Sequence, residues 1–345
     1  MRIAQRSRHG AAHRTANRAL AAAVLTALLA VTAGCGGSTP APTSPGAAEP
    51  GRSPELTTAP AGTVTMLASQ PEGMAYDEKT DILAVAVRDS NRLLLVQGAT
   101  GKTVRTIALP GHARHLQMGG PGGPVLVPAE DSNTFVSVAL PGGQITQTPV
   151  GEYPHDAAQT ASGRILVADE RGGTLSLIED GKVIDTFDQP TQPGGVAADG
   201  DTVAVVDVGA FTISTYDVST STLVGTEPAG AGPTHLVADG NGGAIVADTR
   251  GNQLLLFGLD PLAQRAAYPL PGTPYGIAYD RTARVVWVTL TAKNEVVGLD
   301  VSGSAPTEVA RYPTVRQPNT VAVDPATGRL WVASRTTGQL QTIDR

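Results

Sequence analysis

The sequence has a single cysteine, few aromatic residues and few charges. Among its 345 residues Cys35 is the only thiol, which excludes an internal disulfide framework and a metal site built from several cysteines. Aromatic residues make up 4% of the chain and charged residues 16%. Gly-rich phosphate loops, Gly-x-Ser-x-Gly turns and His-Glu-x-x-His helices are also missing. The sequence therefore carries none of these common catalytic signatures.

Long apolar runs are equally scarce, and the longest lies near the amino terminus. Ala19–Ala33 is apolar over 15 residues, short of the about 20 that a membrane span needs. Five arginines and no acidic residue occur in residues 1–34, as in a secretory signal peptide. The following Val-Thr-Ala-Gly-Cys resembles the bacterial lipobox, with Thr32 where leucine is commonest. The resemblance implies removal of residues 1–34, lipidation of Cys35 and a cell-membrane, extracytoplasmic location; the alternative is an ordinary signal peptide.

Residues 35–61 follow as a segment rich in Pro, Ser, Thr and Gly. Such a composition buries too little apolar surface to fold, so we expect a disordered linker. Without residues 1–34 the chain has 20 basic and 31 acidic residues, a net charge of −11. An acidic body is unsuited to binding nucleic acid. The expected membrane contact is therefore the lipid on Cys35.

The rest of the chain, residues 62–345, repeats one pattern seven times. The units begin at Pro71, Ala113, Pro154, Pro193, Pro233, Pro274 and Pro318, which are 39 to 44 residues apart. Each contains short, β-branched apolar runs bounded by turns, typical of strands. Four strands in a repeat of about 40–45 residues indicate a propeller blade. The sequence predicts an all-β, seven-bladed β-propeller.

The last repeat ends after its third strand, and residues 62–70 (GTVTMLASQ) resemble the missing fourth. We expect this amino-terminal strand to complete the last blade, because closure removes an exposed sheet edge. Trp287 and Trp331 occupy the same place in the last two repeats, which indicates packing between blades rather than ligand stacking.

The patterns Pro-x-Gly-apolar-Ala-x-Asp and Val-Ala-Asp are similar to NHL and YVTN-type propeller repeats. Together with the lipobox and linker, they make the chain resemble a group of actinobacterial cell-envelope lipoproteins. This resemblance covers nearly all of the mature chain and is specific for fold. It says little about activity, since propellers carry many unrelated functions.

Antiparallel geometry brings two repeat positions to one end of the central channel. One position is the third residue of each repeat, which precedes the innermost strand. The other is the end of the second strand, which runs back antiparallel to the same face and lies near Arg88 and Glu130 in the first two repeats. The candidate ligand-binding residues at this rim are His115, Asp156, Asp169, Arg171, Asp207, His235, Asp248 and Arg250. His112 and His155 fall outside the channel-facing position, so we expect them to be solvated.

Three interpretations of the rim remain open. The aspartates could cap the turn between the second and third strands by accepting backbone hydrogen bonds. The rim could recognise a small molecule, a glycan or an envelope protein. It could also hold a divalent metal or act in catalysis, as in propeller lactonases or streptogramin lyases, although the asparagine ligands of lactonases are not evident.

We expect a lipid-anchored binding or scaffolding module at the cell envelope, with no cofactor and no catalytic residue assigned. The observations behind this are the lipobox, the linker and the lack of a complete catalytic constellation. The alternative is a metal-dependent hydrolase or a streptogramin-lyase-like enzyme that uses the His/Asp rim. Within the rim, His235 and His115 differ most from their counterparts in the other repeats.

Overall fold

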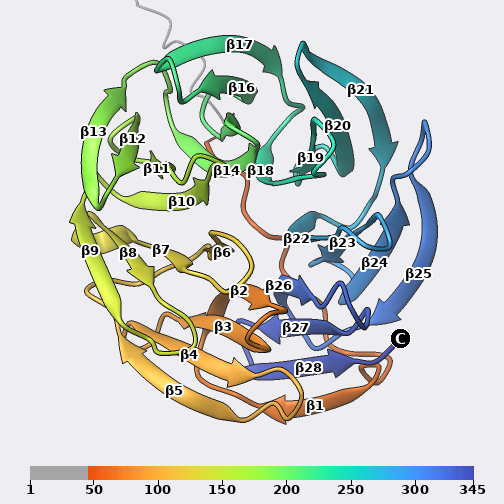
Figure 1. Ribbon diagram of the computed structural model, residues 1–345. Coiled ribbons are helices and arrows are strands. Elements are labelled where there is room, and N and C mark those ends of the chain that lie inside the picture. Colours follow the sequence, from red (N-terminus) through yellow and green to blue (C-terminus); the bar gives the residue numbers. More distant parts are fainter. Residues whose placement is uncertain (1–45) are drawn as a thin grey trace, which may run out of the picture. The chain divides into compact units, whose positions relative to one another are not determined.

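The computed structural model describes residues 46–345, which form seven four-stranded antiparallel sheets around a central axis (Figure 1). The predicted seven-bladed propeller is therefore confirmed. The predicted signal peptide, Cys35 and residues 36–45 of the linker lie outside the described residues. Within residues 46–345, no helix is long and apolar enough to cross a bilayer.

Each blade runs from an inner to an outer strand in chain order, except the last. Blade one consists of β2 (Pro71–Asp77), β3 (Ile82–Val87), β4 (Arg92–Gln97) and β5 (Thr103–Ala108), and blade two of β6 (Gln117–Met118), β7 (Val125–Ala129), β8 (Thr134–Val138) and β9 (Ile145–Pro149). Blade three consists of β10 (Pro154–Gln159), β11 (Ile165–Asp169), β12 (Thr174–Glu179) and β13 (Lys182–Phe187), and blade four of β14 (Pro193–Asp199), β15 (Thr202–Asp207), β16 (Thr212–Asp217) and β17 (Thr222–Pro228). Blade five consists of β18 (Pro233–Ala238), β19 (Gly243–Asp248), β20 (Gln253–Leu259) and β21 (Leu262–Pro269), and blade six of β22 (Pro274–Asp280), β23 (Val285–Leu290), β24 (Glu295–Asp300) and β25 (Thr307–Pro313). Blade seven consists of β26 (Pro318–Val323), β27 (Leu330–Ser334), β28 (Gln339–Ile343) and the amino-terminal strand β1 (Thr63–Met66). A 3-10 turn, η1 (Glu130–Ser132), follows β7.

The core lies between neighbouring blades. Strand β3 (ILAVAV) is buried along its whole length because both of its faces pack against other blades. The outermost strands are mostly exposed, and Val224 in β17 has 60% of its surface accessible. Burial on two faces explains why the second strands read as continuous apolar runs in the sequence.

The ring closes where the sequence predicts. Strand β1 pairs antiparallel with β28, with Thr63 opposite Thr342 and Met66 opposite Gln339. The last blade is therefore completed by the amino-terminal strand. Figure 1 shows the two ends of the propeller chain side by side in this blade.

The two tryptophans fill the joints between blades, as expected. Trp287 is fully buried in one cluster with Val321 and Val332 of blade seven. Trp331 is 1% exposed and packs with Leu83 and Val85 of blade one, with its ring 4.6 Å from that of Tyr76. Both side chains therefore join blades to their neighbours.

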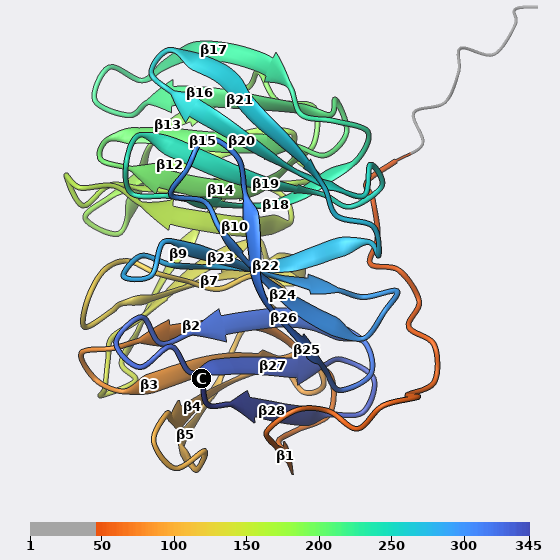
Figure 2. The same cartoon turned by 90° about the vertical axis from the view of Figure 1, so that its right-hand side faces the viewer.

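Residues 46–61, which we call the strap, run along one face of the propeller before β1 (Figure 2). Arg250 donates a hydrogen bond to the Gly46 carbonyl at 2.9 Å, and Gln317 donates one to Gly51 at 2.9 Å. Asn294 donates to the Pro54 carbonyl at 3.0 Å. Here the structure differs from the expected disordered linker. The strap lacks large apolar anchors, but polar loop side chains bind its backbone.

Ser53 is the most buried anchor of the strap, and its replacement by alanine should loosen this segment. Its side chain is buried and donates to the Thr291 carbonyl at 2.5 Å and accepts from the Gln317 amide at 3.0 Å. Ser53→Ala leaves the buried Thr291 carbonyl without this donor, a local cost of about 1–3 kcal/mol, while the Gln317 amide keeps its bond to Asn294. We expect faster amide hydrogen exchange in residues 46–55 with unchanged global unfolding. The exposed Thr57→Ala serves as control, and equal exchange in both variants would contradict this role.

Candidate functional site: the strap-side end of the channel

The innermost strand of every blade except the second carries a β-bulge directly after its opening proline. In β10 the pairing passes from Pro154 opposite Asp169 to Asp156 opposite Ala168, so His155 is the extra residue. Such a bulge re-aims the side chain of the inserted residue. Glu72 and Tyr275 fall in the corresponding bulges of blades one and six. The second repeat position therefore contributes side chains to the channel end.

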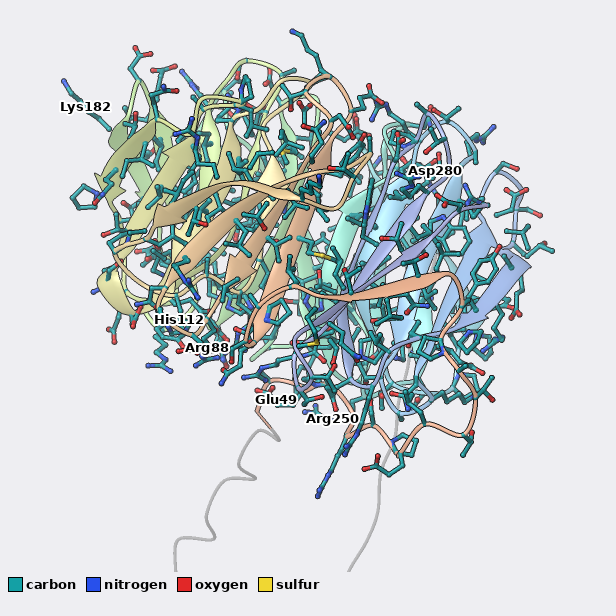
Figure 3. All side chains as sticks on the ribbon, turned by 90° about the horizontal axis from the view of Figure 1, so that it is seen from below. Glu49, Arg88, His112, Lys182, Arg250 and Asp280 are labelled. Atoms are coloured by element: carbon teal, nitrogen blue, oxygen red, sulfur yellow. The ribbon has the colours of Figure 1, made fainter. Side chains whose placement is uncertain are left out.

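Glu72 and Tyr275 line a cavity of about 310 Å³, the strap-side cavity, at the end of the channel that the strap crosses. Its charged and polar lining residues are Glu49, Glu72, Arg88, Arg114, Arg335, His115, His235, Tyr275, Asn319 and Thr320. Glu49 belongs to the strap. In Figure 3, Glu49, Arg88, His112 and Arg250 all lie at this face of the propeller.

Three arginines from blades one, two and seven converge on the cavity. Glu72, 4% exposed, contacts Arg335 at 2.6 Å and Arg88 at 3.5 Å. Arg114 lies 3.5 Å from Glu130, which is outside the cavity lining. Glu72 is thus the only carboxylate that the propeller itself places in the lining, against three guanidinium groups.

His115 and His235 form the inner wall of the cavity. Their rings lie 4.4 Å apart, and the His235 ring contacts Tyr275 at 4.3 Å between centroids. His115 Nε2 and His235 Nδ1 are buried and have no hydrogen-bond partner. Burial lowers the pKa of His235 to about 3 and that of His115 well below its usual value. Both imidazoles are therefore neutral at physiological pH, with polar atoms available to a ligand.

A second cavity, of about 500 Å³, shares both histidines and extends toward the opposite face. Its lining is more apolar and includes Met118, Val237 and Val323. His115 and His235 thus separate a strongly charged end of the channel from a less polar one.

Beside the strap-side cavity, Glu130 is the centre of a buried cluster of charged residues. Its Oε1 lies 2.7 Å from His155 Nδ1, and its Oε2 lies 2.5 Å from His112 Nε2. Glu170 Oε2 lies 3.3 Å from the same His155 nitrogen. Burial alone would raise the pKa of Glu130, but the contacts with His112 and His155 hold it well below its usual value.

The expectation that His112 and His155 are solvated is wrong. Both are 8% exposed and contact Glu130. The bulge at His155 turns it inward, which a strict alternation of side chains does not predict. Glu170 went unnoticed in the sequence, although it and Glu130 both immediately follow a second strand, β11 and β7. An acidic residue at the same place in two successive repeats was the available signal.

The predicted rim aspartates make hydrogen bonds to nearby turns and strands. Asp207 accepts from the amides of Thr191, Gly209 and Ala210, and Asp248 accepts from those of Gly232 and Gly251. Asp169 accepts from the Ser176 and Thr174 hydroxyls at 2.7 and 3.1 Å. None of the three lines the strap-side cavity. The bonds of Asp207 and Asp248 correspond to the turn-capping interpretation, whereas Asp169 is held by two hydroxyls of β12.

The remaining rim candidates have separate roles. Asp156 is buried and accepts from the Val196 amide at 2.9 Å and from Gln117, which ties three blades together near the axis. Burial raises its pKa to about 6. Arg171 stacks on Tyr153, 3.6 Å from the ring centroid, and Arg250 holds the strap. Of the eight residues, only His115 and His235 line the strap-side cavity.

His235→Gln should make the protein less sensitive to acid. The unfolded histidine binds a proton below about pH 6.5, whereas the folded one does so only near pH 3. Between these values the unfolded state binds more protons, so His235 costs the folded state stability as the pH falls. We expect a smaller drop in the urea midpoint from pH 7 to pH 4 in the variant than in the wild type. Equal drops would contradict the buried, neutral state of His235.

Comparison with known proteins gives structural matches only. No protein-family model matches the sequence, and neither does any curated protein. A streptogramin B lyase is 14% identical, with 81% of this chain and 96% of that chain covered and a TM-score of 0.68. The virginiamycin B lyase of Staphylococcus aureus is 15% identical, with coverages of 82% and 98% and a TM-score of 0.69. A chain of Kuenenia stuttgartiensis hydrazine synthase is 16% identical, with coverages of 85% and 98% and a TM-score of 0.68. At these identities the matches show the propeller fold alone.

Proposed function

We propose that this protein is a lipid-anchored, extracytoplasmic propeller that binds a small anionic ligand in its strap-side cavity. The observation that carries the proposal is the convergence of Arg88, Arg114 and Arg335 on a cavity walled by neutral imidazoles. Arginine pairs well with carboxylates because its planar guanidinium donates two parallel hydrogen bonds. A volume of about 310 Å³ is at the small end of ligand pockets.

The cavity offers a ligand neutral polar groups as well as charged ones. Tyr275, Asn319 and Thr320 line the same cavity and offer hydroxyl and amide groups. The two buried nitrogens without partners, on His115 and His235, supply further positions. A hydroxylated carboxylic acid matches this set of donors and acceptors.

Glucuronate, with one carboxylate and several hydroxyls, is a suitable probe of the cavity. A ligand at a hundredfold excess over its Kd stabilises the folded state by about 2.7 kcal/mol, so binding raises the melting temperature. We expect a rise in the wild type and a smaller one in Arg335→Gln. An equal rise in both proteins would place the binding elsewhere, and no rise in the wild type would argue against a hydroxylated acid.

Lipid anchoring rests on the lipobox at Cys35 and is tested separately. Cys35→Ala should move the protein from the membrane fraction to the soluble fraction, because the chain loses its acylation site. The Thr32→Leu variant, which restores the commonest lipobox residue, should stay in the membrane. Membrane retention of Cys35→Ala would rule out the anchor.

Catalysis is the second candidate, and the Glu130–His155–Glu170 cluster favours it. Ligand atoms of these three residues lie within 4.8 Å of one another beside the strap-side cavity. A buried acid next to an imidazole is an arrangement used in general acid–base catalysis. Virginiamycin B is a direct test, since one structural neighbour is a virginiamycin B lyase. Disappearance of the antibiotic's chromatographic peak with the wild type, but not with Glu170→Gln, would support catalysis; persistence of the peak with the wild type leaves binding as the favoured function.

A further inference from the structure

We propose that Glu130, His155 and Glu170 form a binding site for one divalent metal ion of the zinc class. The three residues come from two neighbouring blades, where β7 and β11 end and β10 begins. This inference is independent of the anionic ligand proposed above, because none of the three residues lines the strap-side cavity.

The geometry needs only small side-chain rotations to hold an ion. Nδ1 of His155 lies 2.7 Å from Oε1 of Glu130 and 3.3 Å from Oε2 of Glu170. Two ligands at about 2.1 Å from a tetrahedral zinc ion are about 3.4 Å apart. The His155–Glu170 separation matches this spacing, whereas the His155–Glu130 separation is that of a hydrogen bond and widens when an ion takes the place of the proton.

Neighbouring residues orient the proposed ligand side chains, as they do in known metal sites. Gln192 of blade four donates to Oε1 of Glu170 at 2.9 Å, which leaves Oε2 directed at His155. His112 lies against the other oxygen of Glu130, and its Nδ1 lies 3.3 Å from Asp131. Such outer partners orient the ligands of a metal and raise its affinity.

An independent observation is the unsatisfied oxygen of Glu130. The side chain is fully buried, yet Oε2 makes no hydrogen bond of acceptable geometry, although His112 Nε2 lies only 2.5 Å away. A buried carboxylate oxygen without a hydrogen bond is costly and needs a cation or a donor. His112 Nε2 faces this oxygen, and a metal ion bound at Oε1 beside His155 would balance the remaining charge of the buried carboxylate.

The local charge also favours a cation. Glu130 and Glu170 carry two negative charges, and Arg114, 3.5 Å from Glu130, carries one positive charge. A metal ion would displace the proton between His155 Nδ1 and Glu130 Oε1, and the two carboxylates then face the ion against a single nearby guanidinium. One imidazole and two carboxylates suit zinc better than magnesium or calcium, which prefer oxygen alone.

The test is zinc content and zinc titration of the purified, untagged protein. We expect about one zinc per chain and a rise in melting temperature on zinc addition that a chelator reverses. Glu170→Gln removes one ligand atom but keeps the shape, and should weaken zinc binding at least about 100-fold. Gln192→Ala removes an outer partner and should weaken it about 10-fold.

Glu179→Gln is the matched control, because Glu179 lies in the same blade but pairs with Arg164 at the surface. It should bind zinc like the wild type. Calcium and magnesium should leave the melting temperature of all four proteins unchanged. Absence of zinc from the wild type, or equal zinc affinity in the wild type and Glu170→Gln, would overturn the site, whatever the outcome of the glucuronate experiment.

Discussion

Replacing Trp331 by alanine is expected to lower the free energy of unfolding by about 3–5 kcal/mol. Trp331 is 1% exposed and lies at the joint between blades seven and one, where the ring closes. Truncation removes its contacts with Leu83 and Val85 and leaves a cavity, because the rigid neighbouring sheets cannot collapse into the space. Urea unfolding followed by fluorescence of the remaining Trp287 measures the loss.

The control for this prediction is Val224→Ala on the outer strand β17. Val224 is 60% exposed, so its truncation should change the stability by less than about 0.5 kcal/mol. A loss below about 1 kcal/mol for Trp331→Ala would mean that the closing joint does not depend on this side chain.

Glu130→Gln should also cost about 3–5 kcal/mol of folding free energy, for an electrostatic reason. The carboxylate is fully buried and contacts His112, His155 and Arg114. Its neutral replacement leaves these groups buried without their shared anion. Thermal and urea unfolding measure the effect. The exposed pair Arg164–Glu179 provides the comparison, since Glu179→Gln should cost at most about 1 kcal/mol. Equal losses would show that Glu130 does not stabilise the cluster.

The sequence predicts the architecture well because the blade is a local unit. The opening prolines recur at regular intervals, and the runs between them have the length and composition of strands. The closing strand was predictable for the same reason: the last repeat lacks one strand, and residues 63–66 supply it.

The site was predicted only in part, because it depends on departures from the regular repeat. His115 and His235 were found since they differ from their counterparts at a channel-facing position. His155 was misplaced because a bulge adds one residue to β10. Glu130 contacts His112 and Arg114, which precede it by 18 and 16 residues in the sequence. Such pairings come from the return of a strand to the same face, and repeat alignment alone does not identify them.

The strap illustrates the same limit. Its composition predicts disorder, and its order depends on single hydrogen bonds from distant loops, such as the one from Gln317 to Gly51. Glu49 reaches the strap-side cavity only because these bonds position the backbone. No periodic signal in residues 46–61 encodes this.

The most direct test of the central claim is equilibrium dialysis of the purified protein against a small-molecule extract of the cells that produce it, with mass spectrometry of what is retained. The wild type should retain an anionic molecule. The control variant Arg171→Gln should retain the same molecule, because Arg171 stacks on Tyr153 outside the cavity. Arg335→Gln, which removes a guanidinium from the strap-side cavity, should lose it. Retention of the same molecule by all three proteins, or of none by the wild type, would contradict the account.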